Sequence, residues 1–371
     1  MKGISKLREI FPITQHKVYL NHAAHSPLPR PVRGAMEKQI AHYSQYGDFS
    51  EFDDGKASFA KLVNAKVDEV ALVENTSVGL NMVANMLEYP QGANVVTTDL
   101  EYPSVVYPWK RKKLDVTIRY VENREGKILL DDLEKAVDDQ TVAVVISHVE
   151  YANGFRFDVK AVSEIAHAHG AYLIVDAIQS VGALTVDVKR DDVDFLTAAV
   201  YKWMLGPPGI GYLYVRKELI EKFEPPFIGW ASVKPEIFET INPWEIRNLT
   251  LSETATRFEI GTPSRFSAVG AVAALRILLN VGVPNIEKRI LALTDHLIEK
   301  LKEKKLKLQT PPELKHRSGI VNFLIDKPEE KVEKLKKKGI IVSARSRGVR
   351  VSPHFYNTRE EIDKFVEAVT E

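Results

Sequence analysis

A recurring order of helical stretch and short apolar run constrains the fold of this chain more than any other feature. The clearest unit consists of "TVAVVISH" followed by "DVKAVSEIAHAHGAYLIVDA": an apolar run, an amphipathic stretch that ends at Gly170, and a second apolar run. A strand–helix–strand unit of this kind joins parallel strands, and the pattern repeats from Pro31 to about Val215. The sequence therefore predicts an α/β fold with a parallel sheet wrapped by helices.

The composition and the hydrophobic pattern change after Val215. Residues 224–250 are rich in proline and aromatic residues without a clear period, which predicts a long functional loop; its Trp230 and Trp244 are candidate pocket walls or surface and dimer contacts. From about Asn285 the chain shows lysine-rich helices, three short strands and a closing helix, which predicts a smaller α+β domain. With 371 residues the chain is long enough for about two domains.

Composition excludes several classes of partner. The 51 lysines and arginines nearly balance the 50 aspartates and glutamates, and the lysine runs are interrupted at helical spacing, so we expect no nucleic-acid partner. No apolar run reaches the roughly 20 residues that a bilayer requires, so we expect no membrane partner and a cytoplasmic location. The chain has no cysteine, which excludes disulfides, thiolate metal sites and a thiol nucleophile; we expect no metal.

The stretch "ENTSVGLNMVANMLEY" predicts a helix that begins near Ser77. Leu80, Val83, Ala84 and Leu87 repeat at helical spacing, and polar residues precede them. These polar residues either cap the helix or, with the free backbone N–H groups and the helix dipole, hold a phosphate.

Asp176 ends the apolar run "AYLIVD", at the sheet edge where α/β proteins place their ligands. This carboxylate either caps a following helix or holds the proton of a pyridinium nitrogen. Gln179 lies three residues further on.

Lys202 ends the apolar run "DFLTAAVY" and precedes a turn that contains Pro207, Pro208 and Gly209. An ammonium group at the edge of a core is costly unless it reaches water, is paired, or loses its charge. A desolvated lysine has a lowered pKa and forms Schiff bases readily.

Arg350 alternates with Val349 and Val351 on a predicted strand, in "GVRVSPHFYNT". It is either a surface arginine or a fork for a substrate carboxylate. These four features together favour a pyridoxal-phosphate enzyme that acts on amino acids. They are a site for a phosphate, a carboxylate for a pyridinium nitrogen, a lysine that forms an imine, and an arginine that binds a carboxylate.

Seven segments in order resemble the blocks of the class V aminotransferases, which include cysteine desulfurases, cysteine lyases, kynureninases and isopenicillin-N-epimerase-like proteins. The segments are "VYLNHAAHSPLP", "NTSVGLN", "DLEYPSVVYPW", "IVDAIQSVGAL", "AVYKWMLGPPGIGYLYV", "FEIGTPSR" and "VRVSPHFYNTREEID". They cover Tyr19 to Asp363. The resemblance implies a fold-type-I pyridoxal-phosphate transferase with a mostly parallel seven-stranded sheet. We place the large cofactor-binding domain at residues 17–270 and the small α+β domain at 271–371, with residues 1–16 packed on the small domain.

The resemblance also implies roles for individual residues. Pyridoxal 5′-phosphate would form a Schiff base with Lys202, and its ring nitrogen would pair with Asp176. The other implied cofactor contacts are Thr76, Ser77, Tyr102, Gln179, Tyr201, Gly261 and Thr262. Tyr102 would stack on the ring, a catalytic position, and Gly261 and Thr262 would reach the phosphate in a neighbouring subunit, which implies a homodimer. The implied substrate contacts are Asn21, His25 and Arg350.

Three departures from the family pattern stand out. Tyr102 replaces a stacking histidine, and an aromatic ring still stacks. Ala199 and Tyr201 replace a serine and a histidine before the lysine, so one phosphate hydroxyl is lost and it is open which residue replaces it. Glu150 and Tyr151 stand near the position of a usual asparagine, which leaves the substrate contacts there undefined.

The expected reaction is amino-acid transamination, in which Lys202 removes the α-proton of the substrate attached to the cofactor and a keto acid serves as acceptor. Cysteine desulfuration is excluded because it requires a thiol that this chain lacks. The alternatives are a cysteine- or cystine-type β-lyase and an amino-acid epimerase. A non-catalytic scaffold would not require Lys202, Asp176 and Gln179 together. The substrate side chain and any oligomer beyond a dimer are not defined by the sequence.

Overall fold

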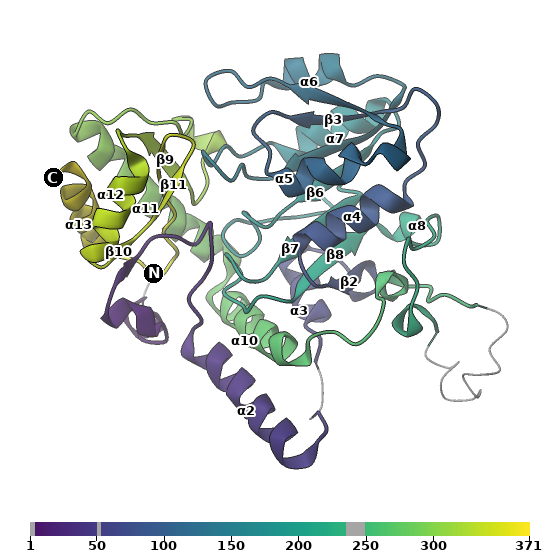
Figure 1. Cartoon of the computed structure of the whole chain (residues 1–371), viewed down its shortest axis with the longest axis horizontal. Coiled ribbons are helices and arrows are strands. Elements are labelled where there is room, and N and C mark those ends of the chain that lie inside the picture. The colour runs from purple at the N-terminus through teal and green to yellow at the C-terminus, as the bar shows by residue number, and fades with distance from the viewer. Residues whose placement is uncertain (1–3, 50–52, 235–248) are drawn as a thin grey trace.

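The computed structural model describes residues 4–49, 53–234 and 249–371 (Figure 1). Its centre is a seven-stranded sheet in which every neighbouring pair is parallel except those of β8, which runs antiparallel to both β2 and β7. The strands, in order across the sheet, are β2 (Val70–Val73), β8 (Gly211–Val215), β7 (Phe195–Ala199), β6 (Tyr172–Asp176), β5 (Thr141–Ser147), β3 (Asn94–Thr98) and β4 (Thr117–Val121). The mostly parallel seven-stranded sheet is therefore confirmed.

The apolar runs of the sequence form strands because both faces of the sheet are covered. Along β5, Ala143 and Val145 belong to one apolar cluster, and Val144 and Ile146 belong to the cluster on the opposite face. This alternation is the period of two of a strand whose two faces are both buried. Helices pack on both clusters: α3 (Lys56–Val63), α6 (Leu130–Ala136) and α7 (Val159–Ala168) on one, and α4 (Thr76–Met86), α5 (Pro103–Val106) and α8 (Lys217–Ile220) on the other.

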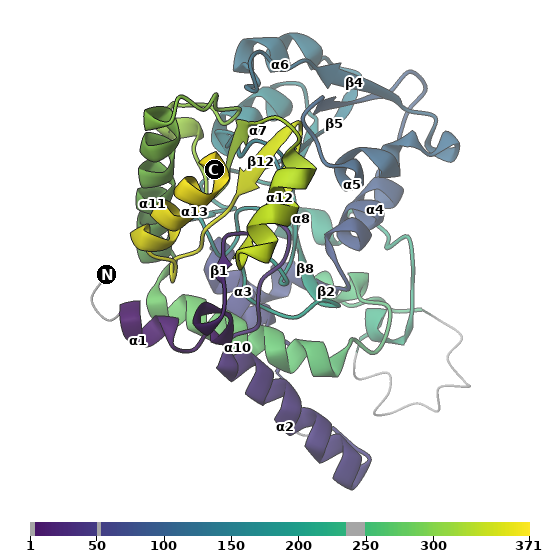
Figure 2. The same ribbon diagram turned by 60° about the vertical axis from the view of Figure 1, so that its left-hand side comes forward.

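A smaller α+β unit lies to one side of the large sheet (Figures 1 and 2). Its three-stranded antiparallel sheet has the order β11-β12-β9. The elements of this part of the chain are α11 (Val283–Glu303), β9 (Val321–Leu324), α12 (Pro328–Lys337), β10 (Ile340–Ile341), β11 (Ser343–Arg345), β12 (Gly348–Val351) and α13 (Arg359–Thr370).

The N-terminal segment lies against this smaller unit. Strand β1 (Val18–Tyr19) pairs in parallel with β10. Arg8, in α1 (Ile4–Arg8), forms an ion pair with Glu361 of α13 at 2.6 Å. The two ends of the described chain therefore pack on the same unit.

Helix α10 (Arg265–Val281) connects the two units and packs along α2 (Arg30–Tyr46). The proposed domain limit at residues 270 and 271 falls inside this continuous helix, so the division of the chain stays a prediction. Within the described residues no single helix is long and apolar enough to span a membrane; α10 and α11 reach that length and composition only as a pair, which is bent by 80°.

Candidate active site

A pocket at the carboxyl edge of the large sheet brings together seven of the predicted residues. They are Thr76, Ser77, Tyr102, Asp176, Gln179, Tyr201 and Lys202. They come from segments far apart in the sequence, and they meet because the carboxyl ends of parallel strands lie at one edge. Asn75, Ser104, Ser147, Tyr151 and Ile178 complete the lining.

Lys202 follows β7, and its partly buried side chain enters this pocket. Its Nζ lies 5.9 Å from the ring centroids of both Tyr102 and Tyr201. Among the described residues no hydrogen bond or ion pair reaches it. Burial lowers the pKa of Lys202 to about 8, with Asp176 opposing the shift and Arg350 adding to it. The amine is therefore much closer to its neutral, nucleophilic form than an exposed lysine.

Asp176 is the last residue of β6 and is 3% exposed. Its Oδ1 accepts a hydrogen bond of 2.9 Å from the Ile178 N–H, and the residues that follow form turns. The alternative that Asp176 caps a following helix is therefore wrong, because no helix begins there. Burial raises the pKa of Asp176 to about 6, opposed by the Ile178 N–H and by Lys202. At neutral pH this carboxyl group is ionised and suited to hold a cationic ring nitrogen.

Helix α4 starts at Thr76, one residue before the predicted start. The side chain of Asn75 caps it by accepting a hydrogen bond of 3.0 Å from the Val78 N–H. Because Asn75 is the N-cap, the hydroxyls of the next two residues are not needed for capping and have other partners. Thr76 Oγ1 accepts from the Ala199 N–H at 3.0 Å, and Ser77 Oγ lies 2.7 Å from Ser104 Oγ. Hydroxyls and helix N–H groups thus meet at the positive end of the α4 dipole, an arrangement suited to a phosphate.

The Gln179 amide is held from two sides. Its Nε2 donates to the Ala23 carbonyl at 3.0 Å, and its Oε1 accepts from Trp203 Nε1 at 2.9 Å. This fixed orientation leaves one N–H of the amide for a ligand in the pocket.

Tyr201 keeps its hydroxyl proton and can donate a hydrogen bond, because burial, and after it the charge of Asp176, raises the pKa of Tyr201.

Arg350 is 1% exposed, so its interpretation as a surface residue is wrong. Its Nη1 donates to the Tyr151 carbonyl at 2.7 Å, while Nε and Nη2 are buried without a hydrogen-bond partner in the described chain. Burial lowers the pKa of Arg350 to about 9, and Arg345 lowers it further. Two nitrogens of a buried guanidinium that lack acceptors among the described residues form an incomplete carboxylate site.

The other two predicted substrate residues lie in the N-terminal segment. Asn21 Oδ1 accepts a hydrogen bond of 3.0 Å from Ser343 Oγ, on the strand that pairs with β12. The His25 ring is 5.7 Å from the Tyr201 ring, and the Ser26 N–H donates to the Tyr201 carbonyl at 2.9 Å. The segment therefore lies between the strand of Arg350 and the turn of Lys202.

Two acids lie beside Asp176: Glu101, which the sequence analysis did not single out, and Glu150, which it named only as a departure from the family pattern. Glu101 accepts hydrogen bonds from the Ser147 N–H at 2.5 Å and from the Ser147 hydroxyl at 2.6 Å. Glu150 accepts from Thr98 Oγ1 at 3.3 Å, and its Oε2 has no partner in the described chain. Burial raises the pKa of both glutamates, and Glu101 raises that of Glu150 further. Each lies three residues after the end of a buried strand, at the sheet edge where Asp176 ends β6, and that position was the available signal.

Gly261 and Thr262 are not part of the Lys202 pocket. They line a separate depression together with Gly209, Ile260 and Ser264. Trp230, in a short 3-10 helix (Trp230–Ser232), lies beside Gly261 rather than in the Lys202 pocket; Trp244 lies outside the described residues. Gly261, Thr262 and Trp230 therefore do not line the Lys202 pocket of their own chain.

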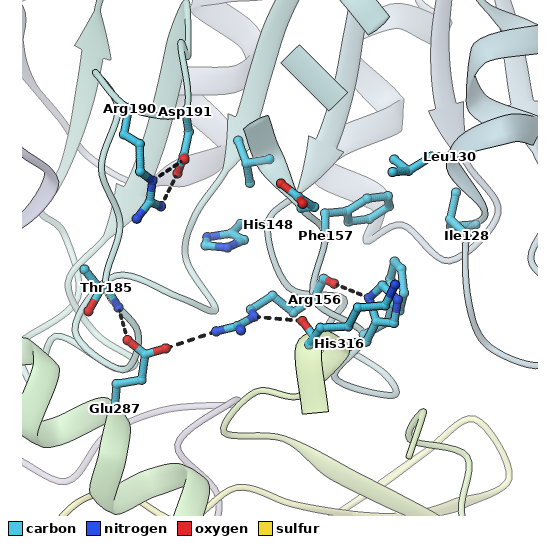
Figure 3. A pocket seen from close by; sticks show the side chains of 14 residues that line it. Ile128, Leu130, His148, Arg156, Phe157, Thr185, Arg190, Asp191, Glu287 and His316 are labelled. Carbon is cyan, nitrogen blue, oxygen red and sulfur yellow. Dashed lines mark hydrogen bonds and ion pairs between the residues drawn. The ribbon is translucent and has the colours of Figure 1, made fainter. Parts of the chain in front are cut away.

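A second cavity of about 410 Å³ contains none of the predicted residues (Figure 3). Arg156 pairs with Glu287 at 3.0 Å, and Arg190 pairs with Asp191 through two hydrogen bonds of 2.6 and 2.7 Å. His148 lies between these pairs in the view, and burial, followed by Arg156 and Arg190, lowers its pKa to about 3. We call this space the paired cavity, because its two arginines face acids that neutralise them.

The fold and the Lys202 pocket define an α/β enzyme of the fold-type-I pyridoxal-phosphate class. The chain belongs to the class-V aminotransferase family, whose model matches residues 18–365. Enzymes of this family use pyridoxal 5′-phosphate.

Individual relatives cover nearly the whole chain. The uncharacterized aminotransferase YcbU of Bacillus subtilis is 32% identical, over 98% of this chain and 96% of its own length. The apo structure of a cysteine desulfurase from Thermococcus onnurineus is 30% identical with a TM-score of 0.88, over 98% of this chain and 96% of the other. A C-DES mutant with glycine covalently linked to its PLP cofactor has a TM-score of 0.89 at 21% identity, over 98% and 99%, and supports the fold alone.

The pocket fits pyridoxal 5′-phosphate. Among the described residues the Lys202 amine has no hydrogen-bond or ion-pair partner, as an aldehyde-binding lysine requires, and the Asp176 carboxyl group is ionised at neutral pH. Hydroxyls lie at a helix N-terminus, where a phosphate binds. The roles of the individual residues stay predictions.

Proposed function

We propose that this chain is an amino-acid aminotransferase with Lys202 as its base. The observation that carries the proposal is the state of that amine: partly buried, unpaired among the described residues, and with its pKa lowered to about 8. Such an amine takes up and releases a proton near neutral pH, as a residue that shuttles a proton to and from a substrate carbon must. The bound cofactor supplies a carbonyl for the substrate amino group and an electron-poor ring.

The remaining pocket residues orient the cofactor. Asp176 keeps the proton on the ring nitrogen, which makes the ring a better electron acceptor. Gln179 donates to the ring hydroxyl, and Tyr102, 46% exposed and open toward the pocket, covers the ring face. Thr76 and Ser77 hold the phosphate together with the first N–H groups of α4.

The substrate carboxylate binds Arg350. Nε and Nη2 of Arg350, buried without a partner in the described chain, point to an acceptor that a ligand brings, and a carboxylate accepts a hydrogen bond from each in parallel. Asn21 and His25 close the substrate side. Tyr151, whose carbonyl fixes Arg350, connects this grip to the Lys202 pocket.

We propose a homodimer in which Gly261 and Thr262 reach the partner's phosphate. Their separation from the Lys202 pocket within one chain supports this arrangement. Sedimentation velocity tests it, and so does complementation: a mixture of Lys202→Ala and Thr262→Trp chains, each inactive alone, regains activity only if one subunit serves the other's site.

Desulfuration is not proposed, although relatives carry that name, because the chain has no thiol to accept the sulfur. The holoenzyme is tested with amino donors with and without a keto acid. A transaminase forms product only with the acceptor present and leaves pyridoxamine phosphate when the acceptor is omitted. Pyruvate and ammonia from cysteine or cystine alone would contradict the proposal and favour a β-lyase, and change of configuration alone would favour an epimerase.

A further inference from the structure

We propose that Ser104 is a positioning residue for the cofactor phosphate, acting through the Ser77 hydroxyl. The inference rests on the proposed cofactor site. Ser104 Oγ lies 2.7 Å from Ser77 Oγ, and both serines line the Lys202 pocket. Neither hydroxyl has another hydrogen-bond partner in the described chain. Either hydroxyl can therefore be the donor of this hydrogen bond, and a ligand can determine which one donates.

A phosphate sets that direction. Each serine hydroxyl has one proton to donate and lone pairs to accept, whereas the oxygens of a phosphate dianion only accept. With a phosphate at the start of α4, the Ser77 proton points to the phosphate, and its lone pair accepts the proton of Ser104. Hydrogen bonds in such a chain polarise one another, so the Ser77 hydroxyl becomes a stronger donor than it is alone.

The local structure explains how Ser104 reaches this place. Pro103 occupies the first position of α5, which fixes the turn after Tyr102, and α5 packs against α4. One short segment thus places an aromatic ring and a hydroxyl in the pocket.

The chain also needs this second hydroxyl. Ala199, where the family resemblance has a serine, has no hydroxyl, and its N–H is bonded to Thr76 Oγ1. Ser104 does not restore that hydroxyl directly; it compensates for Ala199 by making the Ser77 hydroxyl a stronger donor to the phosphate.

The test compares the binding of two aldehydes to the apoprotein: pyridoxal 5′-phosphate and pyridoxal, which lacks the phosphate. We expect Ser104→Ala to raise the dissociation constant of the phosphorylated cofactor about 3- to 10-fold, as the loss of one hydrogen bond to a charged network would. The constant for pyridoxal should not change. Ser104→Thr, which keeps the hydroxyl, should retain the wild-type affinity, and Ser44→Ala on α2 is the matched control. Absorbance titration gives the dissociation constants of both aldehydes for the wild type and the three variants.

A double-mutant cycle separates the relay from a direct or structural role. Once Ser77→Ala has removed the relay, Ser104→Ala should add no further loss. Equal weakening of both aldehydes, no change in either, or additive losses would each overturn the proposal. If wild-type apoprotein binds neither aldehyde, the cofactor site itself fails, which is a different result.

Discussion

Two neighbouring cavities differ in whether their basic side chains have acid partners. Ser147 and His148 are neighbours in the chain, yet Ser147 lines the Lys202 pocket and His148 lines the paired cavity. In the paired cavity both arginines have acid partners within 3.0 Å (Figure 3). Among the described residues no ion pair joins Lys202 to an acid in its pocket, and Nε and Nη2 of Arg350 beside that pocket have no hydrogen-bond partner. Since an unpaired buried charge destabilises a fold, the contrast indicates where a ligand supplies the missing partners.

The largest difference between the two cavities is expected when the reactive amine is removed. We expect Lys202→Ala to lower activity by about 10³-fold or more, because the covalent anchor and the base are one group. Borohydride should then fix no pyridoxal 5′-phosphate on the protein, as peptide mapping by mass spectrometry would show. Lys315→Ala in the paired cavity should change neither readout. Cofactor fixed at another lysine would contradict the assignment.

Asp176→Asn should lower kcat by about 10²- to 10³-fold, because a neutral amide cannot hold the ring nitrogen as a cation. The same change should stabilise the apoprotein. The raised pKa means that the folded state binds the Asp176 proton more tightly than the unfolded state, so stability falls as pH rises from about 4 to 6 and the penalty is complete at pH 7. Asparagine removes about 1–3 kcal/mol of that penalty. Urea unfolding at pH 7 and at pH 4 tests this; an equal gain at both pH values would refute it.

Arg350→Ala should raise KM for the amino acid by about 10- to 100-fold, because the carboxylate loses a bidentate partner. The matched change Arg156→Ala, which breaks a pair in the paired cavity, should leave KM unaltered. Steady-state kinetics over a series of donors measures both. If decarboxylated amines were used as well as amino acids by the wild type, Arg350 would not be the carboxylate grip.

The pH dependence of cofactor attachment should follow Lys202. Its amine is neutral above about pH 8, so attachment to the apoprotein should slow roughly tenfold per pH unit below that value. An ordinary lysine would already lose rate below its pKa of 10.5. Stopped-flow absorbance between about pH 6 and 10 distinguishes the two profiles.

The smallest effect is expected in the paired cavity. Glu287 accepts hydrogen bonds from Arg156 and from the Thr185 N–H, so Glu287→Gln should lower the free energy of unfolding by about 1 kcal/mol. Steady-state parameters should not change. A large loss of activity would show that this cavity also serves the reaction.

The sequence was sufficient for features that depend on local pattern. Apolar runs between helical stretches predicted the parallel sheet, and residues at the ends of those runs, such as Asp176 and Lys202, do meet in one pocket. The geometry of parallel strands makes this inference possible, because it brings distant chain segments to one edge. The helix predicted near Ser77 begins within one residue of its expected start.

Features that depend on contacts between distant segments could not be predicted in this way. The burial of Arg350 depends on a carbonyl 199 positions away, and Gln179 is fixed by Ala23 from 156 positions away. The polar groups around Asp176 satisfied the pattern for a helix cap. The chain instead forms a turn there, because the Asp176 carboxylate accepts a hydrogen bond from the N–H of Ile178, two residues further on. Glu101, Glu150 and Ser104 gave no periodic signal.

The pairing of β1 with β10 has a consequence for how the molecule is made. Arg8 and its partner Glu361 are 353 positions apart, so the segment that carries Arg8 can dock only after the smaller unit has left the ribosome. The large sheet, whose last strand ends at Val215, can assemble earlier. The segment that carries Asn21 and His25 thus docks after the large sheet has formed, and the substrate side of the pocket is completed only once the smaller unit is present.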